Sequence, residues 1–426
     1  MTAGARRLWF RAHLALGLAL GGWFALLGLT GSALVHYPEI DAWLRPQHRI
    51  VLADPARPVD LDAVLACLRA RHPDRDGPWR IELPRAPDEP VRARYMRPRE
   101  REGQAFAPLL VALHPATLDV LSEGFWGDDP MTWIYDLHYT LLLGPQGRTA
   151  VGIAGLAMLA SLASGVALWW SARGARWRAL IPRWRSGSAR RVYDLHVLLG
   201  AHGAALLSVL CLTGAALALP GPTRALLERV STVGHAAPPE ARVQDDLTGG
   251  MVPREAALPV SLRTAALRGL EALGGGELRW IESSDVRAGN PIALRVHREG
   301  DPGRRFPHNR VWLHPRTGEV LGVQDLRHGS AADGLLAWLH PLHNGEAFGA
   351  TGRLAALVLG ALPFVLFCTG ILRWARKRSA RGHAERAQGG RAECRAVRGA
   401  RDCPPETVRD APGASQSTQD GAIIRG

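Results

Sequence analysis

The segment His13-Leu-Ala-Leu-Gly17 opens an apolar run that closes with Leu29-Thr30-Gly31, and both motifs recur 183 positions later as His196-Val-Leu-Leu-Gly200 and Leu212-Thr213-Gly214. One constant offset across two separate motifs indicates an internal repeat. Each copy is almost free of charge over roughly 20 residues, the length that a helix needs to cross a hydrocarbon core. The sequence therefore predicts a membrane protein in which each half repeats the other.

Four apolar runs interrupt this chain of 426 residues, and the charged residues lie between them. The net charge of +13 could suggest nucleic-acid binding, but 47% of the residues are hydrophobic and they gather in the runs. We therefore expect the lipid bilayer, and no nucleic acid, as the partner of these segments. The runs are 12–35, 149–170, 195–219 and 354–374.

The arginines between the runs predict the orientation, because short Arg-rich loops stay in the cytoplasm. The loop after the second run carries seven arginines before its first acidic residue, Asp194, and the segment after the fourth run begins with Arg376, Lys377 and Arg378. We expect both termini in the cytoplasm of a bacterial cell, and segments 37–130 and 221–345 outside its inner membrane. The first run is too long for a signal peptide and lacks a small-residue cleavage site, so we expect an uncleaved span.

The second and fourth runs, with the residues that lead into them, match at an offset of 205, which aligns Leu137-His138 with Leu342-His343. The segments between the runs match at an offset of 200, which aligns Leu113-His114-Pro115 with Leu313-His314-Pro315. Each half crosses the membrane an even number of times, so the two copies share one orientation. Parallel repeats of this kind are related by an axis along the membrane normal.

This pattern predicts an all-α four-helix membrane bundle with two exterior α+β domains and an internal parallel duplication. Helical spacing of apolar residues near 60–70 and 260–273, and strand-like runs at 90–96 and 291–296, support the exterior part. In chain order we expect a cytoplasmic N-terminus with span one (1–36), the first exterior domain (37–130), spans two and three with the Arg-rich loop (131–220), the second exterior domain (221–337), an interfacial segment with span four (338–374) and a disordered cytoplasmic tail (375–426).

Two pairs of repeated histidines fall at the ends of the expected spans. His13 and His196 lie near the cytoplasmic face, and His138 and His343 lie near the exterior face. An ionisable ring in an apolar helix is costly and needs a partner, which makes it a functional candidate. Two imidazoles from facing helices can hold a b-type haem. The four histidines are therefore predicted to be axial iron ligands of two haems, and the alternative is hydrogen bonding at the membrane interface.

Glycines and arginines near these histidines extend the prediction. Gly17 and Gly200 follow the cytoplasmic-side histidines by one helical turn, on the same face, where a missing side chain leaves room for a porphyrin. Arg148 and Arg353 end two Gly-x-x-Gly-Arg motifs at the exterior mouths of spans two and four. A guanidinium matches a carboxylate, so we expect contacts with haem propionates, and the alternative is a lipid phosphate.

Three further histidines are weaker candidates. His202 is either an alternative ligand or a buried, hydrogen-bonded residue, whereas His340 and His36 are either substrate-side groups or interfacial residues. No nucleophile–base constellation is visible in the sequence, and we predict no catalytic side chain because one-electron transfer is carried by the cofactor. The sequence also contains no Gly-x-Gly-x-x-Gly motif, so the electron donor is expected to be a cytosolic protein or a membrane quinol.

The order of these motifs resembles the PepSY-associated transmembrane family over about residues 6–376. The resemblance rests on Leu-His-x-x-x-Gly before a span ending in Leu-Thr-Gly, on an exterior His-Pro-x-Thr-Gly-Glu-Val-Leu turn, and on Leu-His before Gly-x-x-Gly-Arg. It implies two PepSY-like exterior domains and an iron-regulated inner-membrane protein. Some members resemble ferric-siderophore reductases with two b haems. The first exterior turn departs from the pattern, since Leu118 stands where the second copy has Gly318, so the two domains need not play equal roles.

The leading interpretation is a haem-dependent oxidoreductase that passes electrons across the inner membrane to a periplasmic ferric siderophore or other iron chelate. A second interpretation is a non-enzymatic, membrane-anchored binding or regulatory module in which the histidines are structural. A third is a permease for iron chelates, which only the repeat symmetry supports. Haem content separates the first interpretation from the other two.

Overall fold

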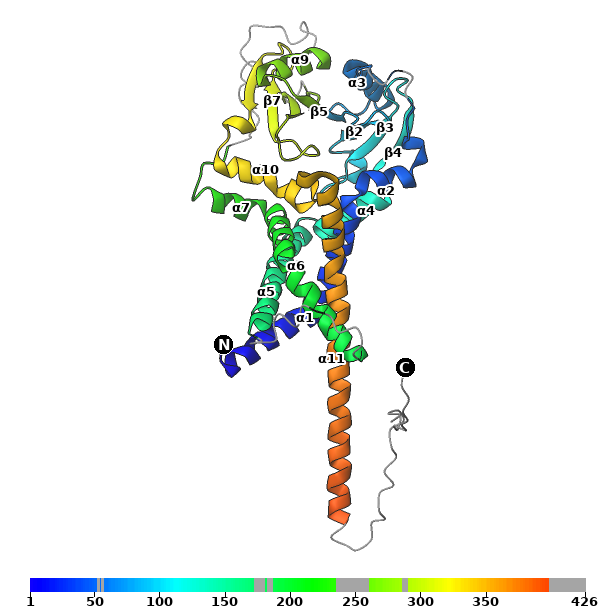
Figure 1. Cartoon of the computed structure of the whole chain (residues 1–426). Coiled ribbons are helices and arrows are strands. Elements are labelled where there is room, and N and C mark those ends of the chain that lie inside the picture. The colour runs from blue at the N-terminus through cyan, green and yellow to red at the C-terminus, as the bar shows by residue number, and fades with distance from the viewer. Residues whose placement is uncertain are drawn as a thin grey trace, which may run out of the picture. The chain divides into compact units, whose positions relative to one another are not determined.

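The structure is a computed structural model that describes residues 1–397, apart from 52, 53, 55, 56, 172–180, 182–186, 235–259 and 286–289. The chain divides into two compact units, Met1–Ile371 and Leu372–Gly426. Most of the Arg-rich loop between the second and third spans lies outside the described residues. The first unit holds an antiparallel sheet and a helical region, which are drawn in Figure 1.

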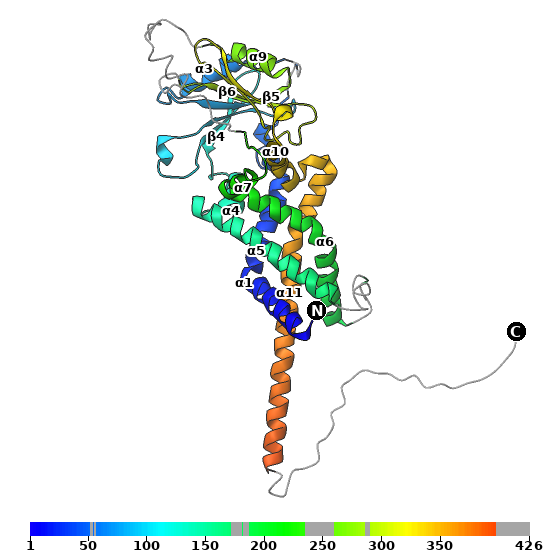
Figure 2. The same ribbon diagram turned by 90° about the vertical axis from the view of Figure 1, so that its left-hand side faces the viewer.

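Among the described residues, four helices are long and apolar enough to cross a membrane. They are α1 (Ala3–Val35), α5 (Gly144–Trp170), α6 (Ser188–Ala218) and α11 (Gly349–Val397). Leu and Ala dominate these segments, and both favour helix. Within the first unit α5 packs against both α1 and α6, as both Figure 1 and Figure 2 show. The chain is therefore a membrane protein with several spanning helices.

Small residues let α1 and the first turns of α11 approach closely. A Cβ atom on Gly28 would lie 2.2 Å from the carbonyl oxygen of Gly360, so neither backbone has room for a side chain there. Next to this crossing, the hydroxyl of Ser32 donates to the carbonyl oxygen of Leu357 at 2.8 Å. Small-residue crossings and hydroxyl hydrogen bonds are typical of helix contacts in membranes.

The sheet has eight antiparallel strands in the order β4-β3-β2-β1-β5-β6-β7-β8. Strands β1 and β5 meet in the middle, where Ile81 pairs with Ile281. Alternating residues of β1, β2 and most of β6 are buried on one face, which is the period-2 pattern of a half-buried sheet. The strands are β1 (Trp79–Glu82), β2 (Val91–Tyr95), β3 (Leu109–Leu113), β4 (Val120–Phe125), β5 (Glu277–Glu282), β6 (Ile292–His297), β7 (Asn309–Leu313) and β8 (Val320–Gln324).

Helices α3 (Leu61–Arg71) and α9 (Leu262–Leu273) pack on the sheet and form one hydrophobic core with residues of both exterior segments. The two segments, which the sequence analysis treats as separate domains, thus share one sheet and one core. Each contributes one helix followed by four strands. Leu118, which replaces the expected turn glycine, adopts a positive φ of 62°, so the first turn keeps the backbone shape of the second despite its side chain.

Short helices connect the sheet to the membrane helices. They are α2 (Tyr37–Leu44), α4 (Pro130–Thr140), α7 (Pro220–Leu227) and α10 (Ala331–His343), with the 3₁₀ turns η1 (Pro46–His48), η4 (Leu326–His328) and η5 (Glu346–Phe348). A further 3₁₀ turn, η2 (Arg99–Arg101), lies between β2 and β3. Proline in the first turn starts α2, α4 and α7, where its missing N–H costs nothing. Gly147 and Gly352 then pack against the backbone of Thr140 and Gly345, so the Gly-x-x-Gly-Arg motif closes a tight turn into α5 and α11.

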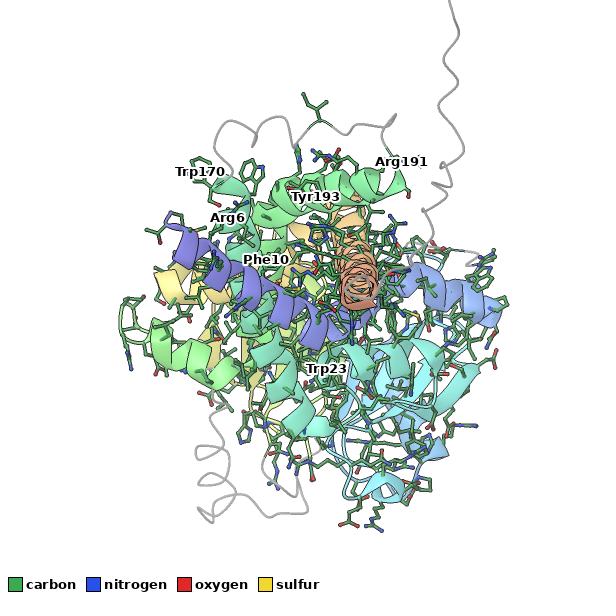
Figure 3. All side chains as sticks on the ribbon, turned by 90° about the horizontal axis from the view of Figure 1, so that it is seen from below. Arg6, Phe10, Trp23, Trp170, Arg191 and Tyr193 are labelled. Atoms are coloured by element: carbon green, nitrogen blue, oxygen red, sulfur yellow. The ribbon has the colours of Figure 1, made fainter. Side chains whose placement is uncertain are left out.

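Arginine and aromatic side chains gather at the ends of the membrane helices that lie away from the sheet. Figure 3 shows Arg6, Phe10, Trp170, Arg191 and Tyr193 from that side. Such a belt marks a membrane–water boundary.

The last helix differs from the expected disordered tail. Helix α11 continues to Val397, whereas the sequence analysis expects disorder from residue 375. The segment after the span contains no proline before residue 404 and is rich in Ala and Arg, which are good helix formers. The remainder of the expected tail, 398–426, lies outside the described residues.

Candidate functional site

His13 of α1 and His196 of α6 lie together in the half of the helical region that is distant from the sheet. Their ring centroids are 6.2 Å apart, and the ring planes are inclined by 77°. The two residues are 183 positions apart in the sequence and come from different helices, so only the tertiary fold joins them. They are called the far-side pair below.

The Nδ1 atom of each far-side imidazole faces a hydroxyl group. His13 Nδ1 lies 3.0 Å from Ser164 Oγ and 3.1 Å from the carbonyl oxygen of Ser161. His196 Nδ1 lies 2.9 Å from Thr369 Oγ1. Both hydroxyls already donate to carbonyl oxygens of their own helices, so they accept from the rings. Each Nδ1 therefore carries the hydrogen, and the ring lone pair is on Nε2.

His138 of α4 and His343 of α10 form the sheet-side pair, close to the sheet end of the membrane helices. Their ring centroids are also 6.2 Å apart, with an inclination of 40°. His138 sits in the last turn of α4, and His343 is the last residue of α10. Tight turns follow both helices, so the two imidazoles are placed by backbone features that the two halves share.

The sheet-side imidazoles repeat the Nδ1 contacts of the far-side pair. His138 Nδ1 donates to the carbonyl oxygen of Leu27 at 3.0 Å and lies 3.1 Å from Thr30 Oγ1. His343 Nδ1 donates to the carbonyl oxygen of Leu210 at 3.0 Å and lies 3.2 Å from Thr213 Oγ1. A carbonyl oxygen can only accept, which again places the hydrogen on Nδ1.

Glycines stand against all four rings. Added Cβ atoms on Gly31 and Gly214 would lie 2.9 and 2.8 Å from Cε1 of His138 and His343. Added Cβ atoms on Gly165 and Gly370 would lie 3.1 and 3.6 Å from Cε1 of the two far-side histidines. A larger residue at Gly31 or Gly214 would displace its imidazole. By contrast, the faces beside Gly17 and Gly200 are open, with no atom within 4 Å or only Leu366 at 3.7 Å.

Burial disfavours the charged form of both sheet-side imidazoles. Burial and the neighbouring His343 lower the pKa of His138 to about 4, and burial also lowers the pKa of His343. A neutral imidazole with hydrogen on Nδ1 offers its Nε2 lone pair as a metal ligand. Each pair can thus supply two ligands to one metal. The described residues contain no cluster of three or more His, Cys, Asp or Glu that could hold a bare ion.

Arg148 and Arg353 bind the ends of membrane helices. Arg148 Nη2 donates to the carbonyl oxygen of Leu217 at 3.0 Å, and Arg353 Nη2 donates to that of Val35 at 2.9 Å. These oxygens lie in the last turns of α6 and α1, where a cation is favourable. Arg353 also pairs with the carboxylate of Glu39. The structure thus gives Arg353 a protein carboxylate in the role that the sequence analysis assigned to a propionate.

The three weaker histidine candidates lie elsewhere. His202 is exposed, and its Nδ1 contacts the carbonyl oxygen of Leu198 in its own helix at 2.9 Å. The ring of His340 packs edge-on against Phe306 at 4.6 Å. His36 lies beside Arg353, with Nδ1 3.3 Å from Nη2.

The hydroxyl and glycine neighbours of the four rings were not singled out as site residues from the sequence. The signal was nevertheless present, because these residues recur at the same offsets as the histidines. Thr30-Gly31 corresponds to Thr213-Gly214, and Ser164-Gly165 corresponds to Thr369-Gly370.

Comparison with protein-family models matches residues 10–377 to the PepSY-associated TM region. The chain belongs to the PepSY-associated transmembrane family. The matched range contains both histidine pairs and all eight strands, and it confirms the resemblance that the sequence motifs carry. Comparison with curated proteins finds no match. Membership of this family makes the chain a membrane-associated, PepSY-containing protein.

Proposed function

We propose that this protein is a di-haem b oxidoreductase of the bacterial inner membrane, which passes electrons from the cytoplasmic side to a ferric chelate outside. The observation that carries the proposal is the 6.2 Å separation of the imidazole centroids in both pairs. Metal–imidazole bonds of about 2 Å on each side of one iron, with each centroid about 1 Å beyond its nitrogen, require a separation of about 6 Å. Both pairs therefore fit two axial ligands of one iron.

The surroundings of the rings fit the same group. Imidazoles that bind a metal through Nε2 donate Nδ1–H to an oxygen that fixes their orientation, and all four rings have such an oxygen. Glycines against the rings and the open faces at Gly17 and Gly200 leave space beside the helices for a flat macrocycle. Haem iron, when bound between two histidines, supplies reversible one-electron transfer.

The duplication is part of this proposal. From the middle of the sheet outwards, the strands of the first segment follow in the order β1, β2, β3, β4, and those of the second follow in the order β5, β6, β7, β8. The two segments therefore occupy equivalent halves of the sheet. The contact of Thr30 with His138 is repeated by Thr213 with His343. We infer two parallel copies related by an axis along the membrane normal, which places one histidine pair in each leaflet. The excess of Arg in the loop after α5 supports a cytoplasmic location of both termini.

In this arrangement the residues of the chain would bind the two haems, orient them and insulate them. The far-side pair would hold one haem on the side of a cytosolic or quinol donor, and the sheet-side pair would hold the other on the side of the exterior acceptor. No side chain needs to transfer a proton, because the reaction moves single electrons. Arg148 and Arg353 clamp the exterior ends of α6 and α1 and so keep the sheet-side pair in register.

The test is a dithionite-reduced minus oxidised absorption spectrum of the purified full-length protein. We expect reduced b-type bands in the wild type and the loss of one haem signal in each of His13→Ala, His196→Ala, His138→Ala and His343→Ala. The signal of the untouched pair reports that the variant is folded. His202→Ala is the matched control on α6 and should keep both signals. A wild-type protein without b-type bands would contradict the proposal and favour a binding module or a permease.

A further inference from the structure

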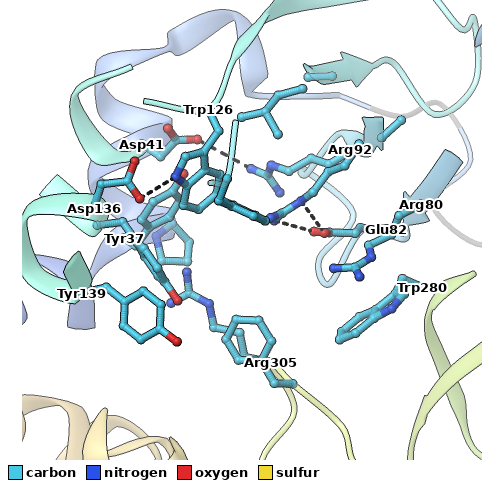
Figure 4. Close-up of a pocket in the computed structure, with 18 of the residues that line it drawn as sticks. Tyr37, Asp41, Arg80, Glu82, Arg92, Trp126, Asp136, Tyr139, Trp280 and Arg305 are labelled. Atoms are coloured by element: carbon cyan, nitrogen blue, oxygen red, sulfur yellow. Dashed lines mark hydrogen bonds and ion pairs between the residues drawn. The ribbon is translucent and has the colours of Figure 1, made fainter. Parts of the chain in front are cut away.

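A cavity of about 820 Å³ lies against the first half of the sheet, where β1, β2 and β3 face α2 and α4. Figure 4 shows side chains of this wall converging on the opening. The volume is within the range of about 300–1,000 Å³ that is typical of small-molecule sites. Tyr135 and Tyr139 of α4 line the cavity, and His138 of the same helix belongs to the sheet-side pair.

The cavity carries an excess of positive charge. Five of its eight arginines pair with carboxylates. Arg85, Arg148 and Arg305 form no ion pair with a carboxylate among the described residues, although the charges of Glu89 and Glu82 act on Arg85 from a distance. The eight arginines lining the cavity are Arg45, Arg80, Arg85, Arg92, Arg94, Arg148, Arg279 and Arg305, against four acidic residues, Asp41, Glu82, Glu89 and Asp136.

Two of these arginines, Arg305 and Arg148, are held in place by aromatic rings. The guanidinium of Arg305 lies over the rings of Tyr37 and Phe306, 5.1 and 5.7 Å from their centroids. Arg148 lies over Tyr139, 4.9 Å from the centroid, and its buried Nε has no hydrogen-bond partner in the described structure. The guanidiniums of Arg305 and Arg148 are thus oriented before any ligand binds, and Arg148 keeps an N–H donor that no described residue accepts.

Like charges in this wall also repel each other. Burial and the positive charge of Arg305 lower the pKa of Arg85 to about 10. A lowered arginine pKa means that the surroundings disfavour the cation, so a bound anion would relieve the repulsion. The cavity therefore carries positive charge that its own carboxylates do not balance, and a negatively charged ligand would neutralise it.

Aromatic rings line the remaining wall. Trp126 packs edge-on against Phe106 and Tyr135, with centroid distances of 5.1 and 5.2 Å. On the other side Trp280 packs against Phe306 at 6.4 Å. Arginine and aromatic faces together suit planar rings that carry negative charge.

We propose that this cavity binds a small, multiply anionic ligand with aromatic rings. The uncompensated guanidiniums of Arg85, Arg148 and Arg305 would bind the anionic groups, and the aromatic wall would hold the rings. The assignment of this ligand as the electron acceptor, an aromatic polyanionic ferric chelate, rests on the function proposed above. The proposal that the cavity binds an aromatic anion does not rest on that function. An anionic lipid headgroup shares part of this chemistry, and the experiment below separates the two sources.

The test measures binding by isothermal titration calorimetry with the full-length protein in nanodiscs of neutral lipid. Gallium(III) complexes stand in for ferric ones, because gallium does not accept an electron. We expect the complex of the disulfonated catechol tiron to bind, the citrate complex to bind more weakly because it lacks rings, and the neutral acetohydroxamate complex not to bind. Affinity for the tiron complex should fall as the salt concentration rises. Equal binding of the neutral complex would overturn the proposal.

Variants locate the ligand. Arg85→Gln and Arg305→Gln should each weaken binding of the gallium–tiron complex by about tenfold or more, since charge-assisted contacts are the strong ones. Arg305→Lys should restore part of the affinity. Arg304→Gln is the matched control. Arg304 precedes Arg305 in the same loop, but its side chain is exposed and does not line the cavity. Unchanged affinity in both glutamine variants would overturn the assignment of the site.

Nanodiscs that contain anionic lipid distinguish the second source. We expect the gallium–tiron affinity to change little in them, whereas its abolition would mean that the cavity is a lipid site and would overturn the proposal. The binding readout needs neither haem nor an electron donor. Absent binding with intact b-type bands would contradict this inference alone, and binding without b-type bands would contradict only the function proposed above.

Discussion

Thr30 of α1 lies 3.1 Å from Nδ1 of His138 on α4, and its hydroxyl donates at 2.8 Å to the carbonyl oxygen of Leu26 in its own helix. The hydroxyl therefore accepts from the imidazole. It fixes the ring orientation together with the carbonyl oxygen of Leu27. Because the second half of the chain repeats the contact, orientation of the ring through Nδ1 is a shared feature of the sheet-side pair.

Thr30→Val is expected to weaken haem binding at the sheet-side pair while keeping the shape of the side chain. Loss of one oxygen that orients a metal-binding histidine typically costs about 10- to 100-fold in affinity, and the remaining bond to Leu27 favours the lower end. The measurement is haem retention under dilution, followed with the reduced spectrum. Thr149→Val, whose hydroxyl bonds only to the carbonyl oxygen of Pro145, is the control. Equal haem loss in both variants would contradict the assigned role.

Gly31→Ala is expected to remove the sheet-side haem signal with little effect on the far-side signal. The new Cβ would lie 2.9 Å from Cε1 of His138, so the ring must leave its position or α4 must shift. Gly22→Ala in the same helix is the control, because its Cβ would make only an ordinary contact of 3.6 Å with Phe367. Absorption spectra and haem-to-protein ratios give the result. Full haem content in Gly31→Ala would show that the glycine does not position the ring.

The histidine pairs could be predicted because the repeated motifs of the sequence indicate which residues occupy equivalent places. The partners of His138 and His343 carry the same repeat signal, but their contacts depend on helix rotation, which the sequence does not encode locally. The pairing of Ile81 with Ile281 could not be predicted from the sequence. It joins two segments about 200 positions apart, and no local pattern specifies which edges of two sheets meet.

The arginine-rich cavity was equally hidden from the sequence. Arg305 reaches it from the loop after β6, whereas Arg85 comes from the loop after β1 and Arg148 from the first turn of α5. Charge pairing also decides which arginines stay available, and it depends on distances between side chains. Arg94, for example, is neutralised by Glu82 at 2.7 Å, while Arg305 stacks on rings instead.

Ile81→Ala is expected to destabilise the exterior sheet in both halves. Ile81 and Ile281 are fully buried at the β1–β5 junction, and truncation of a buried isoleucine costs about 2–5 kcal/mol. Because both segments share one core, limited proteolysis should cleave segment 277–324 faster in the variant although the change lies in the other half. Val51→Ala, at a position that is 92% exposed, is the control. Faster cleavage confined to the first segment would show that the two halves are stable independently.

The exterior sheet is expected to lose stability in acid through Asp325. Hydrogen bonds and ion pairs with Arg327, and the charge of Arg298, lower the pKa of Asp325 to about 2. The unfolded carboxyl has a pKa of about 3.9. The folded state thus binds its proton less readily, so the contribution of this carboxylate is complete above about pH 4 and is lost as the pH falls towards the folded value of about 2.

Asp325→Asn should therefore lower the midpoint of thermal unfolding above about pH 4 and flatten its decline in more acidic solution. Circular dichroism of the full-length protein across this pH range measures the effect. Glu271→Gln on α9 is the control, because it also removes one negative charge. It should leave the pH profile unaltered. A profile of Asp325→Asn parallel to that of the wild type would mean that the ion pairs at Asp325 do not contribute to acid sensitivity. Under that outcome, the carboxylates in the middle of the sheet, where Glu82 of β1 pairs with Arg94 of β2, become the next candidates.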